Sequence, residues 1–304
     1  MPAVLGGVFP PIATIFNPTT GDVDARAIAA NVAKLMTTGL AGVLALGSNG
    51  EAGLLDDGEC EQVIGAARDG VPRERVLLVG VGRESTRATI AAARRAAELG
   101  ADAVLVRPPS YYKSHVSNDA LIAHFRQIAD ASPVPIVLYN LPGPTGVVLM
   151  PAMVATLAEH PNVLGMKETS PDLERLGICT ALRNGAFPVV SGWAPVLYPA
   201  VVAGAAGGIL AVANVLPAEC VALFEHARAG RHAEALALQR SLTKIAMLVS
   251  SVHGIAGLKA ALEMTGSHGG PLRSPLVAVS DKARADIGAA LREAQADQEK
   301  VTRN

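Results

Sequence analysis

Aromatic side chains are scarce in this sequence: its 304 residues include one tryptophan, four tyrosines and five phenylalanines. Half of the residues are nevertheless hydrophobic and 17% are charged, a composition that excludes an intrinsically disordered chain. A core with so few rings has to be filled by valine, leucine, isoleucine and alanine. This composition favours many closely packed helices.

The sequence also lacks a charge bias and a disulfide framework. Its 26 Lys and Arg residues balance 27 Asp and Glu residues, and the formal net charge of −1 gives no basic surface for nucleic acid. The three cysteines, Cys60, Cys179 and Cys220, form no CxxC pair. This cysteine usage is typical of a reduced, cytoplasmic protein.

No segment has the pattern of a signal peptide or a transmembrane helix. The first residues, MPAVLGGVFPPIATIF, contain no basic n-region and no small-residue cleavage site. The most membrane-like stretch has no charged residue from Asn184 until Glu219 is reached, but prolines, glycines and Asn214 interrupt it. Because a membrane helix needs about 20 apolar residues, we expect a buried strand, helix and strand there. We expect no membrane and no nucleic-acid partner.

Metal-binding patterns are missing as well. The seven histidines show neither HxxxH nor HExxH spacing, and none falls at the end of an expected strand. The glycine runs at 80–82 and 204–208 could cradle a phosphate, but such glycines are common in barrel loops. We therefore expect neither a metal nor another cofactor.

Short apolar runs alternate with alanine-rich amphipathic runs along most of the chain. A parallel sheet with right-handed crossovers then favours a (β/α)8 barrel. The alternative, an open doubly wound sheet, usually has a GxGxxG segment after its first strand, and this sequence has none there. The expected strands are 7–14, 42–47, 75–82, 101–108, 135–140, 163–168, 187–192 and 207–212, and the expected helices are 25–38, 86–99, 118–131, 151–160, 172–183, 195–203 and 218–228.

The chain is longer than such a barrel needs. After the eighth helix about 70 residues remain, too few for a second α/β domain, and they form helical patterns at 231–250, 255–265 and 282–296. The sequence therefore predicts a catalytic barrel over residues 1–229 and a helical C-terminal extension over 230–304.

Active sites of these barrels lie at the C-terminal ends of the strands. The residues there are rich in hydroxyl groups and include one lysine and no histidine. They are Thr14, Ser48, Asn49, Gly50, Glu51, Arg107, Tyr139, Asn140, Lys167, Glu168, Thr169, Ser191, Gly192 and Asn214.

Lys167 differs from the other six lysines because it lies within an apolar strand, VLGMKE. The others fall in helical, loop or terminal contexts, where a solvated amine is expected. Burial in a barrel strand disfavours a charged ammonium, and a neutral amine is what forms a Schiff base with a carbonyl compound. The alternative is a structural ion pair with Glu168 or Glu51.

Tyr139 ends the strand that precedes the strand of Lys167. A phenol beside a Schiff base can move protons to and from a carbinolamine and a substrate hydroxyl. The alternative is a tyrosine that packs in the barrel and has its hydroxyl satisfied elsewhere.

Two glycines flank Ser48 and Asn49 in the segment GSNGE, residues 47–51. A strand-to-helix turn of this kind can point consecutive backbone N–H groups at an anion, and a carboxylate is the expected guest. The alternative is a tight turn that only caps a helix. Arg107, which closes the fourth strand, either faces the site or pairs with a neighbouring carboxylate.

Three segments together resemble a known family. GSNGE (47–51), YNLPGPTG (139–146) and GMKET (165–169) look like the signature segments of the dihydrodipicolinate synthase / N-acetylneuraminate lyase family, in the same order and separation. The resemblance extends from about residue 6 to residue 280. It implies a (β/α)8 TIM barrel with a C-terminal helical extension, pyruvate bound as a Schiff base, and a homotetramer.

The resemblance also implies roles for single residues. Lys167 would form the Schiff base, Tyr139 would shuttle protons, and Ser48 would belong to the proton relay. A third tyrosine would enter from a neighbouring subunit, and it matches Tyr111, with Tyr112 as a close alternative. The pyruvate pocket would be lined by the backbone of Ser48 and Asn49, by Gly192 and by the backbone of Ile209.

Departures from the family pattern narrow the expected substrate. Dihydrodipicolinate synthases carry an arginine for the aldehyde's carboxylate where this chain has Pro144, and Glu84 and Ala88 replace polar positions of their lysine feedback site. The segments GSNGE, 110–125, 254–259 and 269–276 are instead similar to 4-hydroxy-2-oxoglutarate aldolase.

The sequence therefore predicts a class I aldolase that cleaves a 4-hydroxy-2-oxo acid to pyruvate and an aldehyde, glyoxylate in the case of 4-hydroxy-2-oxoglutarate. The alternatives are dihydrodipicolinate synthesis, or an aldolase or dehydratase acting on a 2-oxo-3-deoxy sugar acid. A metal-dependent aldolase and a pyruvate-binding protein without turnover are more distant alternatives.

Overall fold

The computed structural model describes residues 4–303, with side chains described as far as residue 296. Eight parallel strands form one sheet in the order β1-β8-β7-β6-β5-β4-β3-β2. They are β1 (Gly7–Phe9), β2 (Gly42–Ala45), β3 (Val76–Gly80), β4 (Ala103–Val106), β5 (Ile136–Asn140), β6 (Val163–Glu168), β7 (Val189–Ser191) and β8 (Gly207–Ile209). Each strand lies within a segment that the sequence predicts as a strand.

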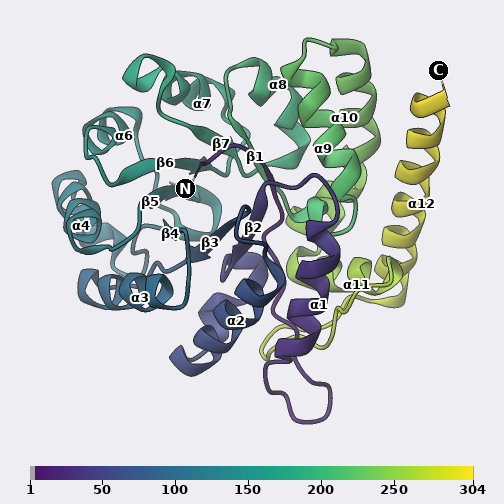
Figure 1. The fold of residues 1–304 in the computed structure, drawn as a ribbon, viewed down its shortest axis with the longest axis horizontal. Helices are drawn as coiled ribbons and strands as arrows, with labels where there is room; N and C mark the ends of the chain where they lie inside the picture. Colours follow the sequence, from purple (N-terminus) through teal and green to yellow (C-terminus); the bar gives the residue numbers. More distant parts are fainter. Residues whose placement is uncertain (1–3, 304) are drawn as a thin grey trace.

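The sheet curves until β1 and β2, the two ends of this strand order, meet. A parallel bridge joins Pro11 to Leu44, and the backbone N–H of Leu44 donates to the carbonyl of Pro10 at 2.9 Å. Figure 1 shows the strands at the centre with helices around them. The predicted (β/α)8 barrel is confirmed. The named strand β1 ends before Pro10 and Pro11 because proline has no N–H for a strand ladder.

The surrounding helices follow the strands in order. They are α1 (Ala25–Met36), α2 (Asp57–Gly70), α3 (Thr86–Glu98), α4 (Asn118–Ala131), α5 (Pro142–Thr145), α6 (Pro151–Ala158), α7 (Leu173–Thr180), α8 (Leu197–Val202) and α9 (Pro217–Arg228). Neither α2 nor the single turn α5 is among the helices predicted from the sequence. The clearest signal for α2 is a capping box, in which Asp56 and Glu59 each accept the other's backbone N–H.

Two apolar layers fill the molecule. One lies between the sheet and the helices and is built largely from valine, leucine, isoleucine and alanine. The other fills the barrel, where inward-pointing residues of successive strands stack in layers. It consists of Leu5, Phe9, Leu44, Leu78, Ala103, Leu105, Val137, Tyr139, Leu141, Val190 and Ile209. Phe9 and Tyr139 are the two aromatic residues of this layer among the described residues. Aliphatic side chains therefore form most of the barrel interior.

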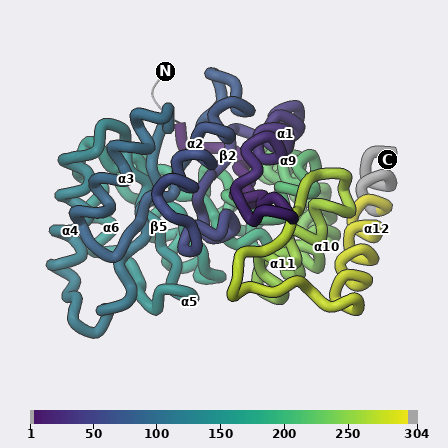
Figure 2. Tube along the Cα trace, turned by 90° about the horizontal axis from the view of Figure 1, so that it is seen from below, coloured from purple at the N-terminus to yellow at the C-terminus, as the bar shows by residue number. Residues whose placement is uncertain are grey.

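The C-terminal extension contains α10 (His232–Met247), a π-helical turn (Leu248–Val252), α11 (Gly254–Met264) and α12 (Asp281–Arg303). These helices occupy one side of the barrel, and Figure 2 shows the α11 region beside the N-terminal segment and α1. The backbone carbonyl of Thr265 accepts from Nζ of Lys34 at 2.9 Å, which ties the extension to α1. The predicted helical extension is therefore present and packs directly on the barrel.

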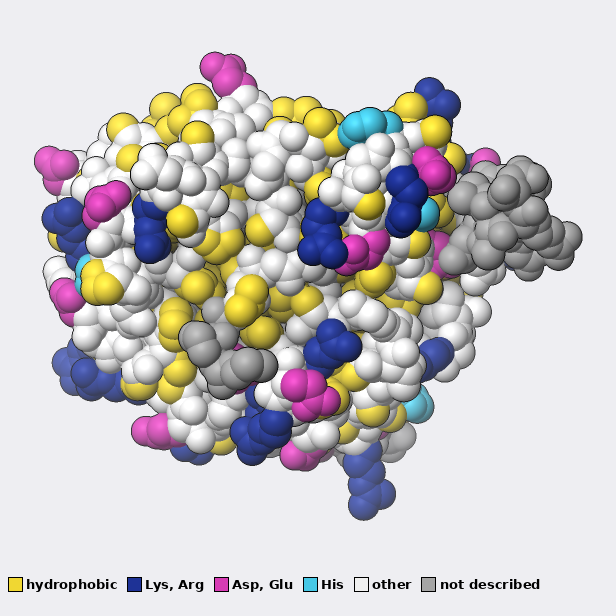
Figure 3. All heavy atoms as spheres, turned by 45° about the horizontal axis from the view of Figure 1, so that its top comes forward, with side chains coloured by type: hydrophobic (Ala, Val, Ile, Leu, Met, Phe, Trp, Pro, Cys, Tyr) yellow, Lys and Arg dark blue, Asp and Glu magenta, His cyan; other side chains and the backbone are white. Residues whose placement is uncertain are grey.

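The surface carries mixed charges. On the face drawn in Figure 3, acidic and basic side chains are interspersed. Cys60, Cys179 and Cys220 are all buried as free thiols. Within residues 4–303, no helix is both long enough and apolar enough to cross a bilayer.

His124 makes the stability of the fold depend on pH. It is buried on α4, its Nδ1 lies 2.9 Å from the Thr86 hydroxyl, and burial lowers its pKa to about 4. In the unfolded chain the pKa of this histidine is near 6.5. The unfolded chain therefore binds more protons than the folded one between about pH 4 and 6.5, so stability falls as pH falls through this window.

We expect the free energy of unfolding of wild type to fall by about 2 kcal/mol more than that of His124→Gln between pH 7 and pH 5. Urea unfolding at both pH values measures the difference, and equal losses would contradict this assignment.

Candidate active site

A cavity of about 570 Å³ opens at the C-terminal ends of the strands. Six side chains or backbone positions expected at the site line it together: Ser48, Asn49, Tyr139, Lys167, Gly192 and Ile209. The C-terminal extension closes another side of the same cavity with Ala246, Ser250, Ser251, Gly254 and Ile255. The cavity is thus formed by both segments that the sequence predicts.

Lys167 and Tyr139 face each other from neighbouring strands. The parallel register pairs Tyr139 of β5 with Lys167 of β6. Nζ of Lys167 lies 3.2 Å from the Tyr139 hydroxyl and 4.3 Å from the centroid of its ring. Only 4% of Lys167 is exposed. The amine is therefore held against a phenol in an apolar environment, with the open cavity before it.

The ion pair considered as an alternative for Lys167 is absent from the described residues. Glu168 points to the other face of β6, as successive side chains of a strand do. Both of its oxygens accept from the Asn140 amide, at 2.9 and 2.7 Å. Burial raises the pKa of Glu168, although bonds from Ser170 and Asn140 oppose this rise. Asn140 and Glu168 therefore tie β5 to β6 directly behind the two reactive side chains.

Ser48, Asn49 and Gly50 form a single helical turn after β2. The turn is bracketed by two left-handed residues, Leu46 (φ 54°) and Glu51 (φ 53°), a conformation that costs about 1–2 kcal/mol per residue without glycine. The Thr14 hydroxyl donates to the carbonyl of Gly50 at 2.6 Å. Within residues 4–303, the backbone N–H groups of Ser48 and Asn49 donate to no protein atom, so both can bind a ligand.

Gly192 leaves the space in front of Lys167 open. A Cβ atom at this position would overlap the Thr169 hydroxyl and lie 2.9 Å from Cε of Lys167. The Thr169 hydroxyl is buried and has no hydrogen-bond partner among the described residues. Thr169 also lines the cavity.

A second cavity of about 280 Å³ shares Ser48 and Tyr139 with the first. Arg107 lines it and pairs with Glu84 at 2.9 Å, so this residue has both of the roles that the sequence offered as alternatives. Burial alone raises the pKa of Glu84, but Arg107 and two backbone N–H groups hold it below its usual value.

Tyr111 does not reach the cavity of its own chain. Its backbone N–H donates to Glu84 at 2.9 Å, while 79% of the residue is exposed. The neighbouring Tyr112 is 67% exposed, and the two rings contact edge to face. Both tyrosines are therefore presented outward from the loop that follows β4.

Lys259, which we expect from the sequence to be solvated, is buried instead, so this prediction is wrong. Lys259 lies on α11 with 3% of its side chain exposed, and it pairs with Glu51. Burial lowers its pKa, while Glu51 opposes this shift. The missed signal is its place in the apolar segment GIAGLKAALEM. The cavity residues Ser250 and Ser251 had no comparable signal, because only the packing of α10 and α11 brings them to the barrel mouth.

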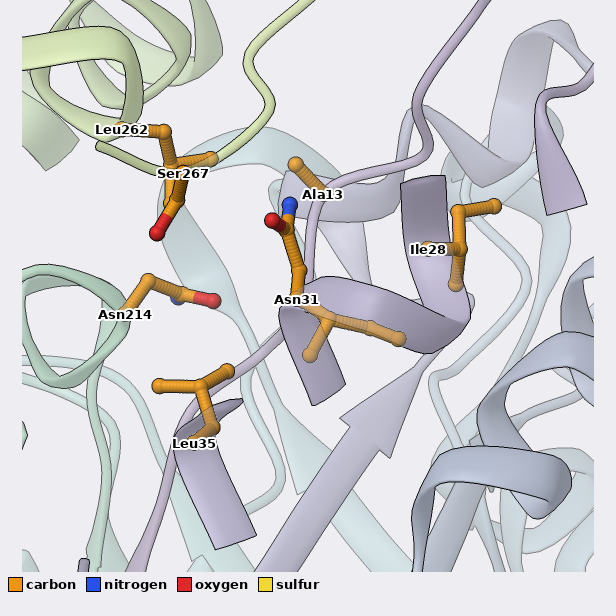
Figure 4. Close-up of a pocket in the computed structure, with 8 residues that line it drawn as sticks. Ala13, Ile28, Asn31, Leu35, Asn214, Leu262 and Ser267 are labelled. Atoms are coloured by element: carbon orange, nitrogen blue, oxygen red, sulfur yellow. The ribbon is translucent and has the colours of Figure 1, made fainter. Parts of the chain in front are cut away.

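Asn214 has a structural position away from Lys167. Its Nδ2 donates to the carbonyls of Pro11 and Ala211, at 3.0 Å each. Figure 4 shows it at a small cavity with Asn31 of α1 and Ser267 beyond α11. This cavity of about 10 Å³ has the volume of about one water molecule. It is too small for an organic substrate.

The electrostatics of the main cavity limit what it can bind. Among the described residues that line it, Lys167 alone has a cationic side chain, and Pro144 lies on its wall. No three His, Cys, Asp or Glu side chains of the described part of the chain come together as metal ligands. The arrangement combines a buried amine, a phenol, free N–H groups and several hydroxyl groups, and these can form and break a Schiff base.

A family model matches nearly the whole chain. The model of the Dihydrodipicolinate synthetase family matches residues 4–294. The chain belongs to this family. Members of the family are pyruvate-dependent lyases, and the protein is an enzyme of this class.

Two curated relatives carry different activities in their names. A probable mitochondrial 4-hydroxy-2-oxoglutarate aldolase of Emericella nidulans is 38% identical over 95% of this chain and 93% of its own. A 4-hydroxy-tetrahydrodipicolinate synthase of Methanoculleus marisnigri is 37% identical over 89% of this chain and 92% of its own. Such similar identities show the family and leave the substrate open.

Solved structures show the same fold over almost the whole chain. YagE of Escherichia coli K12, a prophage protein of the family in complex with pyruvate, has a TM-score of 0.89 and 30% identity, covering 96% of this chain and 99% of its own. The 4-hydroxy-tetrahydrodipicolinate synthase of Methylacidiphilum fumariolicum has a TM-score of 0.93 and 25% identity, covering 99% of both chains.

Gly192 provides a test of the cavity. Because a methyl group there would displace Thr169 and press on Lys167, we expect Gly192→Ala to lower kcat/KM at least about a hundredfold. Gly177→Ala is the matched control, since its Cβ on α7 would meet nothing within 4 Å. The control should keep its activity and gain up to about 1 kcal/mol of stability. Steady-state kinetics and thermal unfolding of both variants check this, and an active Gly192→Ala would contradict the position of the site.

Proposed function

We propose that the protein is a class I aldolase that cleaves a 4-hydroxy-2-oxo acid, such as 4-hydroxy-2-oxoglutarate, to pyruvate and glyoxylate. The main support is the contact of 3.2 Å between Nζ of Lys167 and the Tyr139 hydroxyl in a cavity at the barrel mouth. A buried amine beside a proton carrier is what Schiff-base chemistry requires.

The reaction begins when Nζ of Lys167 attacks C2 of the 2-oxo acid. Loss of water from the carbinolamine gives an iminium ion, and Tyr139 transfers the protons of these steps. Removal of the C4 hydroxyl proton then breaks the C3–C4 bond and releases glyoxylate. The electron pair of that bond passes to the iminium group, which becomes an enamine. Protonation at C3 and hydrolysis release pyruvate and restore the amine.

The two ends of the substrate meet different parts of the cavity. The backbone N–H groups of Ser48 and Asn49 bind the carboxylate next to C2. Gly192 and Ile209 line the same cavity, as do Ser250 and Ser251. The two serines are the polar side chains that the C-terminal extension offers to the aldehyde end.

A second copy of the chain completes the site in this proposal. The cavity of about 280 Å³ beside Ser48 and Tyr139 is open to the surface, and Tyr111 projects outward from its loop. Tyr111 of a neighbouring subunit would enter this cavity and extend the proton relay through Ser48. A homotetramer of the family type and a cytoplasmic location belong to the same proposal.

Dihydrodipicolinate synthesis is the nearest alternative, because a relative of 37% identity carries that name. The cavity argues against it. Dihydrodipicolinate synthases hold the second carboxylate of aspartate semialdehyde with an arginine, and this chain has Pro144 at that position on the cavity wall.

Product analysis tests the function. Purified protein with 4-hydroxy-2-oxoglutarate should release glyoxylate and pyruvate in equal amounts, at a rate at least ten times that of condensing pyruvate with aspartate semialdehyde. Lys167→Met should reduce the release by at least about 10⁴-fold, because it removes the nucleophile. A chelator should change nothing.

Two outcomes would overturn this assignment. Faster consumption of aspartate semialdehyde would make the protein a synthase. Pyruvate binding with no turnover of any 2-oxo acid would make it a binding protein. A screen of 2-oxo-3-deoxy sugar acids in the same assay distinguishes the remaining alternative.

A further inference from the structure

A buried ion pair adjoins the turn of Ser48 and Asn49 but lies outside the cavity. Nζ of Lys259 is 2.6 Å from Oε1 of Glu51, and 3% and 0% of the two side chains are exposed. Glu51 directly follows the turn, whereas Lys259 belongs to α11, more than 200 residues further along the chain. The described lining of the cavity includes neither residue.

The surroundings of Lys259 fix its amine in place. Nζ donates to the carbonyl of Pro271 at 2.6 Å and lies 4.5 Å from the centroid of the Phe16 ring. Nζ of Lys259 therefore makes an ion pair with Oε1 of Glu51 in addition to its hydrogen bond with Pro271. The amine therefore has partners from the N-terminal segment, from the turn and from the C-terminal segment.

Glu51 is held from a second side by Arg273. The backbone N–H of Arg273 donates to Oε2 of Glu51 at 2.9 Å. Its guanidinium group donates to both carboxylate oxygens of Glu59 on α2, at 3.0 and 2.7 Å. It also lies 4.3 Å from the centroid of the Phe16 ring. Both oxygens of Glu51 are therefore bound by the segment between residues 259 and 273.

The backbone at Glu51 needs this support. Its φ of 53° places it in the left-handed region that residues with a side chain rarely adopt. Such conformations persist where the surrounding structure determines them and are frequent at ligand sites. A buried ion pair adds little net stability compared with apolar side chains of similar size.

We propose that Glu51 and Lys259 are positioning residues that aim the backbone N–H groups of Ser48 and Asn49 at the carboxylate of the bound 2-oxo acid. This inference rests on the proposed function. It makes the C-terminal extension part of the carboxylate site, although the described lining of the cavity includes none of its charged groups. Loss of the pair loosens carboxylate binding while Lys167 and Tyr139 stay in place on β5 and β6.

Three variants test the inference. Lys259→Met removes the ammonium, and Lys259→Met combined with Glu51→Gln also removes the carboxylate that would be left unpaired. Lys244→Met is the control, because its ion pair with Glu293 joins α10 to α12 at a similar distance of 2.7 Å but is about 60% exposed. Each variant is reduced with borohydride at increasing pyruvate concentrations, and the covalent adduct is measured by mass. Thermal unfolding first sets a temperature at which all of them are folded.

We expect both Lys259 variants to raise the pyruvate concentration for half-maximal trapping at least tenfold and to change the maximal trapping rate less than threefold. Lys244→Met should match wild type in both values. In steady-state cleavage of the 2-oxo acid, the Lys259 variants should likewise raise KM and leave kcat nearly unchanged. If the unpaired Glu51 prevents Lys259→Met from folding, the double variant alone provides the test.

An unchanged half-maximal concentration in a folded Lys259 variant would overturn the inference. An equal loss of maximal trapping rate and affinity would also overturn it, because that pattern indicates general damage to the protein. The same holds if Lys244→Met raises the half-maximal pyruvate concentration as much as the Lys259 variants do. Wild type that forms no adduct at any pyruvate concentration would contradict the proposed function itself, so the two failures are distinguishable.

Discussion

The parallel register of β5 and β6 is the constraint on which the site depends. It sets Tyr139 beside Lys167 and, one residue further, Asn140 beside Glu168. Because successive side chains alternate between the faces of a strand, the first pair points to the cavity and the second pair is bonded behind it. A shift of one residue in either strand would separate the amine from the phenol and leave Glu168 buried without its Asn140 bonds.

The other half of the cavity depends on a turn held in an unfavourable conformation. Leu46 and Glu51 are both left-handed, and the bonds that hold Glu51 come from α11 and from Arg273. The extension therefore does more than lengthen the chain. It closes the cavity with Ser250 and Ser251 and reaches the turn that presents Ser48 and Asn49. Barrel and extension form one active-site framework.

The sequence was sufficient to predict the barrel, since its β-branched runs and their spacing are local features. It was also sufficient to predict that Ser48, Tyr139 and Lys167 meet at the barrel mouth, because parallel strands all end at the same edge. It was insufficient to identify the partner of Lys259. The apolar segment GIAGLKAALEM indicates burial, but only the fold brings Glu51 next to this lysine. Tyr111 stays a prediction, because a single chain exposes it.

The most direct test of the account is to locate the covalent adduct of pyruvate. Wild-type protein is treated with pyruvate and borohydride, digested, and its peptides are measured by mass spectrometry. The account predicts one added pyruvyl-derived group per chain, on Lys167, and none in Lys167→Met. A chain that stays unmodified, or an adduct on another lysine such as Lys113 or Lys259, would contradict it.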